Sequence, residues 1–210
     1  IRWKTFPSAS LGWRFDKEEW FPFSHDVINM FKVRGSYGEL GNENIGEYQF
    51  QATMNRNNMT YSFGNNPITG SAVSTFVNEN IAWEKKKTTN VGIDLAMLNN
   101  RIEFTAEWYK NVSEDLLYGV PVPTNAGVAN TSVTMNAASM ENSGLEFSLT
   151  YRDKTSYGLD YNVSANLSTL KNKVTSLGFG TEQYLAGDYI TYVGQEIGQF
   201  YGYEYKGIAR

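Results

Sequence analysis

Hydrophobic and polar residues alternate along much of the chain. In residues 101–110, which read RIEFTAEWYK, apolar side chains at even positions face one way and polar ones at odd positions face the other. The same period of two recurs in residues 8–15, 31–38, 90–98, 144–151 and 158–167. A period of two is that of a β-strand, and a helical period of 3.6 fits none of these segments. The pattern therefore predicts an all-β protein whose strands have one apolar and one polar face.

Two pairs of segments are expected to form antiparallel hairpins. If Asn99 and Asn100 make a two-residue turn, the numbers of facing residues sum to 199. Each apolar residue before the turn then faces an apolar residue after it. For the last two segments a sum of 308 works in the same way and places Leu149 opposite Leu159. Both registers predict a continuous apolar face.

The connections between the predicted strands are alternately short and long. The turns at 99–100 and 152–157 are short, whereas residues 110–142 read as a long polar loop and about fifty residues separate Gly38 from Thr89. Long loops are uncommon inside compact soluble domains. Their alternation with short turns is typical of an outer-membrane β-barrel, whose tilted strands need about 9–11 residues. A soluble β-sandwich, as in an extracellular adhesin or carbohydrate-binding module, has the same alternation and is the alternative.

Composition and charge narrow the function classes. The chain is 41% hydrophobic and 15% aromatic, with 14 Tyr, 12 Phe and 5 Trp, which are residue types that favour strands. A net charge of −4 argues against nucleic acid as a partner, which would require a basic face. Without Cys, and with His25 as the single His, we expect no metal site and no cofactor. No apolar run is long enough to predict a transmembrane helix.

Longer phrases in the chain resemble the barrel of SusC/RagA-type TonB-dependent transporters. The resemblance rests on FPSASLGWRF, FKVRGSYGELGNENIGEYQF, NENIAWEKKKTTNVGIDLAMLNNRIEFTAEWYKNVSEDLLYGVPVP, NAASMENSGLEFSLTY, NLSTLKNKVTSLG and GQEIGQFYGYEYKGI. These phrases span the chain in the family's order. The one departure noted is Glu196, where the family phrase has proline.

This resemblance implies antiparallel transmembrane β-barrel strands with long extracellular loops, part of a barrel of about 22 strands in the outer membrane. Residues 1–210 would be a central-to-late portion of that barrel domain, with the plug domain and the closing C-terminal strands outside it. The family's activity is active import of oligomeric nutrients, either oligosaccharide or peptide, without bond chemistry. The implied partners are a SusD-like surface lipoprotein, TonB acting through the missing N-terminal region, and outer-membrane lipid.

The two faces of the strands then lie in different environments. Residues expected to face lipid are Ile93, Leu95, Ile102, Phe104, Trp108, Phe147, Leu149 and Val163. Residues expected to face the lumen are Asp94, Glu103, Glu107, Glu146, Asp160 and Asn162.

Two of these carboxylates invite comparison with a glycosidase. Glu103 and Glu107 are four residues apart, which along a strand is about 13 Å. The paired carboxylates of glycosidases lie about 5–9.5 Å apart. We therefore predict no catalytic residue and interpret both as lumen charges.

Residues 42–83 combine aromatic rings with amides, a mixture that suits sugar binding because rings stack on C–H groups while amides bond hydroxyls. Packing of these rings within the loop is the competing interpretation. The candidates for contact with a substrate or a lid are Tyr48, Tyr61, Phe63, Asn65, Asn66 and Trp83.

Overall fold

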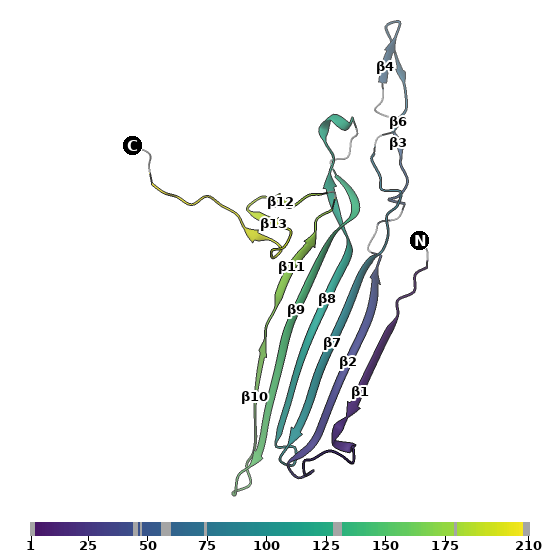
Figure 1. Cartoon of the computed structure of the whole chain (residues 1–210). Coiled ribbons are helices and arrows are strands. Elements are labelled where there is room, and N and C mark those ends of the chain that lie inside the picture. Colours follow the sequence, from purple (N-terminus) through teal and green to yellow (C-terminus); the bar gives the residue numbers. More distant parts are fainter. Residues whose placement is uncertain are drawn as a thin grey trace.

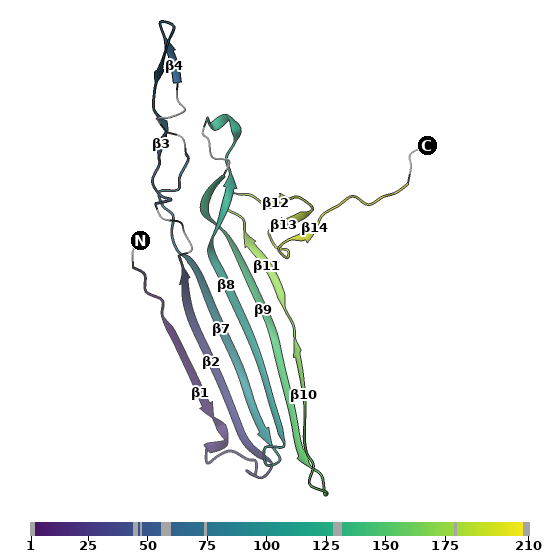
Figure 2. The same cartoon turned by 180° about the vertical axis from the view of Figure 1, so that it is seen from behind.

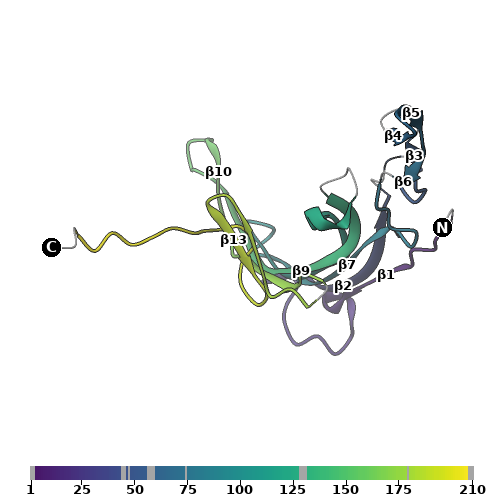
Figure 3. The ribbon, with the colours of Figure 1, turned by 90° about the horizontal axis from the view of Figure 1, so that it is seen from above.

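One large antiparallel sheet dominates the structure, a computed structural model that describes residues 3–43, 46, 48–55, 60–73, 75–127, 132–178 and 180–207. Its strand order is β1–β2–β7–β8–β9–β10, with β11 paired to β9 further along. The strands form a single layer (Figures 1 and 2), which is curved when seen from above (Figure 3). The strands are β1 Ser8–Arg14, β2 Ile28–Asn42, β7 Glu84–Met97, β8 Ile102–Pro121, β9 Ser132–Lys154, β10 Asp160–Ser168 and β11 Lys171–Ser176. The prediction of an all-β antiparallel fold is confirmed.

Smaller elements gather towards one end of the sheet, which we call the loop end (Figure 1). They are β3 Met54–Asn55 with β6 Ala72–Val73, β4 Thr60–Phe63 with β5 Asn66–Thr69, the sheet of β12 Gln183–Ala186, β13 Tyr189–Tyr192 and β14 Gln199–Phe200, and the short 3-10 helix η2 Thr124–Ala126. A second 3-10 helix, η1 Phe15–Lys17, lies at the opposite end, which we call the turn end. In the described ranges, no helix has the length and apolar character needed to cross a membrane.

The first predicted hairpin is confirmed in its register. Met97 pairs with Ile102 and Leu95 with Phe104, so the facing numbers sum to 199. Asn99 and Asn100 have φ angles of 56° and 62°. Leu98, the residue before them, is also at positive φ, 53°, so the reversal contains three consecutive left-handed residues. Asn tolerates this conformation better than other residues that carry a side chain.

The second predicted hairpin has the wrong register. Strand β9 continues to Lys154, which pairs with Asp160, so the facing numbers sum to 314. The turn is closed by the backbone N–H of Thr155, which donates to the carbonyl of Leu159 at 2.9 Å. Leu149 consequently faces Ala165 and not Leu159. The shift of six residues is even, so every side chain remains on its predicted face.

The predicted long loop over residues 110–142 is also wrong. Strands β8 and β9 remain paired as far as Pro121 and Ser132, apart from bulges near Leu116. Backbone pairing does not need alternating side chains, and the ladder here continues through residues whose apolar and polar side chains do not alternate, as at Leu116, Leu117 and Tyr118. The actual connection, residues 122–131, is short.

The sheet has almost no hydrophobic core. The buried hydrophobic residues of the described part are Ala96, Val174, Leu177 and Ile190. On the apolar face, by contrast, Leu11 is 78% exposed and Val163 is 62% exposed. A β-sandwich would cover such a face with a second sheet, and none packs there among the described elements. The sandwich alternative is therefore wrong, and the apolar face needs apolar surroundings.

Asp16 organises the connection between β1 and β2 at the turn end. Its carboxylate is fully buried and accepts hydrogen bonds from Arg14 Nε at 2.6 Å and from the backbone N–H of Phe31 at 3.0 Å. Its carbonyl oxygen lies 2.8 Å from His25 Nε2. The hydrogen bonds from the Arg14 guanidinium are the main cause that lowers the pKa of Asp16 to about 2. One carboxylate thus joins two strands and their connection.

We expect Asp16→Asn, in the full-length protein that contains this chain, to lower the free energy of unfolding by about 1–3 kcal/mol, because a buried amide replaces a charged acceptor of several donors. The folded-state pKa of Asp16 lies below its ordinary value of about 3.9. Its contribution is therefore fully present above about pH 4 and is lost as the pH falls towards 2.

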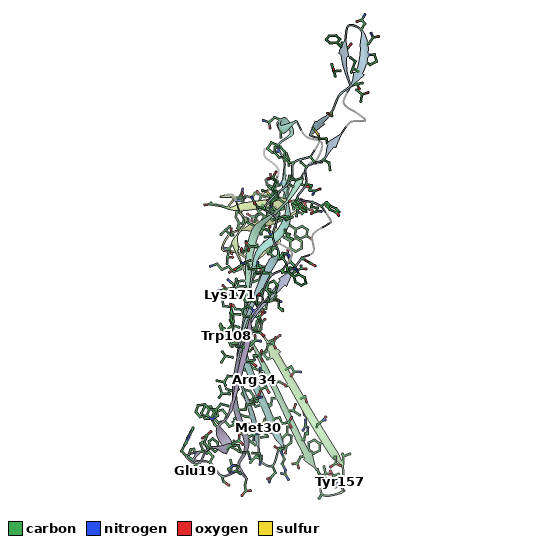
Figure 4. All side chains as sticks on the ribbon, turned by 90° about the vertical axis from the view of Figure 1, so that its right-hand side faces the viewer. Glu19, Met30, Arg34, Trp108, Tyr157 and Lys171 are labelled. Carbon is green, nitrogen blue, oxygen red and sulfur yellow. The ribbon has the colours of Figure 1, made fainter. Side chains whose placement is uncertain are left out.

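The measurement is the heat-unfolding midpoint of the detergent-solubilised protein at pH 7 and near pH 2. Glu19→Gln is the control, since Glu19 is an exposed carboxylate on the same connection (Figure 4). Asp16→Asn should lower the midpoint at pH 7 much more than near pH 2. Equal midpoints for this variant and the control at pH 7 would contradict the prediction.

Candidate functional site

The two faces of the sheet separate apolar from polar side chains as the alternation predicted. Strand pairing places the predicted lipid-facing set on one face and the predicted lumen-facing set on the other, with Asp94 opposite Thr105 and Glu107 opposite Glu146. The connection after β1, whose Phe15 and Phe21 rings pack against Phe31 of the apolar face, hangs from the convex side of the layer (Figure 3). The apolar face is thus convex and the polar face is concave.

An arginine connects three strands on the concave face. Arg34 of β2 pairs through Nε with Asp94 Oδ2 of β7 at 3.2 Å, and through its terminal nitrogen with Glu107 Oε2 of β8 at 2.6 Å. Gly92 gives the guanidinium its space, since a Cβ there would lie 3.0 Å from Arg34 Cζ. The three charged side chains are only 20–32% exposed. The single cation therefore bridges two partly buried carboxylates and offsets part of their negative charge.

Other predicted lumen carboxylates have cations of their own. Arg152 donates two hydrogen bonds to Glu103, at 2.7 and 3.0 Å, and Lys154 lies 3.7 Å from Asp160 beside the turn. Glu103 and Glu107 are thus held by different arginines on different strands and share no site. This arrangement supports their interpretation as wall charges.

A row of amides crosses the concave face nearer the loop end. Asn111 pairs in register with Asn142, and Asn172 Nδ2 donates to Asn142 Oδ1 at 2.6 Å. The Oδ1 of Asn172 in turn accepts from the backbone N–H of Ile197 at 2.9 Å. Sequence reasoning missed this row because residues 110–142 were read as a loop. The available signal was the recurrence of Asn in these segments of the sequence, at Asn111, Asn142 and Asn172.

The candidate loop residues separate into two groups. Tyr61, Phe63, Asn65 and Asn66 lie together on the β4–β5 hairpin, which is the most distant point of the loop end (Figure 1). The side chains are exposed, with Phe63 at 73%. Asn65, at φ 65°, helps to form the tight turn. The hairpin thus presents two rings and two amides to the exterior.

Tyr48 and Trp83 lie nearer the sheet. Tyr48 contributes to a groove of about 350 Å³ that residues 132–134 also line. The ring of Trp83 stacks on Phe6 with a centroid distance of 5.8 Å. This stacking agrees with the interpretation in which rings pack the loop, and contact of any of the six residues with a substrate or lid stays a prediction.

An apolar cavity of about 420 Å³ lies between the upper parts of β8 and β9 and strand β13. The rings of Tyr118, Tyr184 and Tyr189 line it, together with Val174 and Ile197. The hydroxyl of Tyr118 donates to the carbonyl of Leu177 at 2.7 Å, which fixes that ring. The sequence gave no signal for this cavity, because its lining comes from segments far apart in the chain.

Comparisons with known proteins agree with this architecture. The family model described as "TonB dependent receptor-like, beta-barrel" matches residues 2–207. The TonB-dependent receptor P3 of Formosa agariphila is 33% identical over 99% of this chain and 21% of its own length. The TonB-dependent receptor SusC of Bacteroides thetaiotaomicron is 34% identical over 93% of this chain and 19% of its own length.

Solved structures give the same result. The RagAB peptide importer in its closed-closed state matches with a TM-score of 0.80 and 29% identity, over 97% of this chain and 22% of that chain. The open-open state matches with a TM-score of 0.77, 28% identity and 93% and 20% coverage. The chain spans about a fifth of the length of the relatives it matches.

We expect Arg34→Gln to lower the free energy of unfolding by about 1–3 kcal/mol, because two partly buried carboxylates lose their common cation. Arg152→Gln is the matched control, and it should cost no more than about 1 kcal/mol because the Arg152–Glu103 pair is exposed. Adding Glu107→Gln to Arg34→Gln should recover part of the loss. Unfolding midpoints of the full-length protein in detergent measure all three variants. A loss for Arg34→Gln no larger than that for Arg152→Gln would contradict this account.

Proposed function

This chain belongs to the TonB dependent receptor-like β-barrel family, and on that premise we propose that it forms part of the wall and external loops of an outer-membrane importer. Residues 1–210 constitute a partial barrel domain in this proposal. A plug domain and the strands that close the barrel lie in other parts of the full-length protein. The convex face contacts lipid, the concave face lines the lumen, and the loop end faces the exterior.

The observation that carries the proposal is the exposed apolar convex face. On β7 this face is apolar from Met97 to Val91 and becomes charged at Lys87. From Met97 to Val91 is six residue steps, or about 20 Å along the strand, and to the first charge at Lys87 is ten steps, or about 33 Å. A tilt of about 40° reduces these lengths to heights of roughly 15 Å and 25 Å. The apolar band of a transmembrane barrel is about 25 Å tall, which is the height of the uncharged stretch that ends before Lys87.

The proposed activity is active import without bond chemistry. The energy is delivered by TonB to a part of the protein outside this chain, and a SusD-like lipoprotein covers the loop end. The substrate is an oligomeric nutrient, either a glycan or a peptide. Similar proteins named SusC and RagAB peptide importer support this assignment at the level of the family.

The concave face suits the passage of large polar molecules. Several of its carboxylates are paired with cations held on neighbouring strands, as in the Arg34–Asp94 and Arg152–Glu103 pairs. Paired charges keep the wall hydrated, while a field of a single sign would attract or repel charged solutes strongly. The amide row adds hydrogen-bonding groups that are neutral.

The orientation of the wall can be tested by site-specific labelling. In the full-length protein in its native membrane, Phe104→Cys should react with a lipid-soluble maleimide, and Thr105→Cys should not. The reason is that neighbouring residues of a strand point to opposite faces. Thr105→Cys should react only with a small water-soluble reagent. The reverse pattern at the two positions would overturn the proposal.

The role of the β4–β5 hairpin can be tested by uptake. We expect Tyr61→Ala with Phe63→Ala to reduce uptake of a fluorescent oligomer at least about fivefold, since exposed aromatic anchors carry much of the binding energy of a contact. The probes are labelled linear glucan oligomers and labelled casein-derived peptides, supplied to cells with and without a protonophore.

Phe23→Ala is the matched control, because Phe23 is an exposed ring at the opposite end of the sheet. If the hairpin variant and the wild type are present in the outer membrane in equal amounts and take up the probes at the same rate, the hairpin does not contact the substrate. A wild-type strain that takes up neither probe faster than a deletion strain would count against import of both substrate classes.

A further inference from the structure

The apolar cavity near the loop end lies between two layers of this chain. Ala138 and Met140 of β9 and Val174 of β11 line it on the side of the large sheet, and the Val174 side chain is only 2% exposed. Tyr184 of β12 and Tyr189 of β13 line it on the side of the small sheet, which leans over this end of the large one (Figure 1). Segments far apart in the sequence thus enclose one space.

The cavity lies on the concave face. Neighbours on a strand alternate, so Val174 points to the same face as Asn172 of the amide row. Met140 pairs with Val174 just as Asn142 pairs with Asn172, two residues further from the loop end. The segment after β13 crosses the same face, because the backbone N–H of Ile197 donates to Asn172 Oδ1 at 2.9 Å. The cavity therefore begins where the amide row ends, on the side nearer the loop end.

Three polar side chains that line the cavity are already engaged within the protein. The hydroxyl of Tyr118 donates to the carbonyl of Leu177 at 2.7 Å. Thr191 Oγ1 accepts from the backbone N–H of Gly198 at 3.1 Å. The carboxylate of Glu84 accepts from a backbone N–H of β8 and from a side-chain amide of β2, both at 2.8 Å. These groups need no polar ligand, and most of the remaining lining is carbon.

The volume of the cavity is that of a ligand site. Close-packed protein interiors leave few voids larger than a water molecule, whereas this one measures about 420 Å³. An apolar cavity of about 150 Å³ holds a benzene molecule. Burial also raises the pKa of the Tyr118 hydroxyl above its ordinary value, as expected where water is scarce. The space suits a bulky aliphatic or aromatic group.

The tyrosine rings of the cavity pack against other rings. Tyr118 and Tyr184 meet edge to face with their centroids 6.3 Å apart, and Tyr189 packs against Phe200 with a centroid distance of 5.1 Å. These contacts hold the rings in place as walls. They also use ring surface on which a sugar would otherwise stack.

We propose that this cavity binds a bulky apolar side chain of the imported oligomer, which is accordingly a peptide. This inference rests on the proposed function and chooses between the two substrate classes named there. A sugar unit carries hydroxyls around its ring, and each hydroxyl placed in an apolar cavity without a partner is costly. An aliphatic or aromatic side chain buries only apolar surface, which is favourable. The peptide backbone stays outside the cavity, on the polar concave wall.

The test measures binding of three peptides that differ only in their central residue. Each is a fluorescein-labelled nonapeptide of Gly and Ser with Leu, Phe or Ser at its centre, titrated onto the full-length protein in detergent. We expect the wild type to bind the Leu and Phe peptides at least about tenfold more tightly than the Ser peptide, because full burial of such a side chain is worth at least that factor. Fluorescence anisotropy gives the three dissociation constants.

Variants of the cavity wall connect this preference to the cavity. Ala138→Phe fills the space and should abolish the preference while the Ser peptide binds as it does to the wild type. Tyr184→Ala removes one wall at an exposed position, should reduce the preference at least about threefold, and serves if Ala138→Phe does not fold. Ala126→Phe is the matched control, since Ala126 is exposed on η2, and should retain the full preference.

Equal binding of the three peptides by the wild type, as expected if another part of the full-length protein fills the cavity, would overturn the inference. An unchanged preference in the folded cavity variants, or no binding of any peptide, would also overturn it. Uptake of labelled glucan oligomers by cells tests the importer assignment separately. A protein that imports glucan and binds no peptide would keep the proposed function and lose this site.

Discussion

The hydrogen-bond ladder between neighbouring strands is the interaction on which this structure depends. A single curved layer with exposed side chains on its apolar face has little core to hold it, so backbone pairing must provide the cohesion. Inside a bilayer this requirement becomes stricter, because an unpaired N–H or C=O in hydrocarbon costs several kcal/mol. Between β7, β8 and β9 the registers run without interruption through the apolar band, and the bulges between β8 and β9 lie beyond it. The register of β2 against β7 shifts beside Met97, at the turn end of the band.

Side-chain interactions between neighbouring strands then give the concave and convex faces of the sheet their different polarity. On the concave face, Arg34 connects strands that are distant in sequence, and amides form a row where charge gives way to neutral polarity. On the convex face, apolar side chains give way to charge at one height on several strands. Asp16 at the turn end and the tyrosine-lined cavity near the loop end are the places where side chains are packed closely.

The sequence could predict those strands whose one face is apolar and whose other face is polar, because the side chains of such strands alternate. Alternation identified both faces and, through the tolerance of Asn99 and Asn100 for positive φ, the first hairpin. It failed over residues 110–142, because apolar and polar residues do not alternate regularly there, as at Leu116 and Leu117, while the backbone ladder continues. The register of the second hairpin was ambiguous, since any even shift keeps apolar residues opposite one another. Contacts such as Arg34 with Glu107 join segments too far apart for any local pattern to reveal.

The continued pairing of β8 and β9 has a mechanical consequence. From Lys110 to Pro121 the two strands extend about 35 Å along their length beyond the apolar band. Strand β7 accompanies this extension as far as Glu114, and beyond that point β8 and β9 form a stem that, in the proposed orientation, carries the η2 connection well clear of the lipid surface. A macromolecule that binds this stem can transmit force to the wall without contacting the bilayer. The same backbone ladder that holds the apolar part of the sheet together therefore also stiffens this extension, so that force applied to the extension reaches the wall.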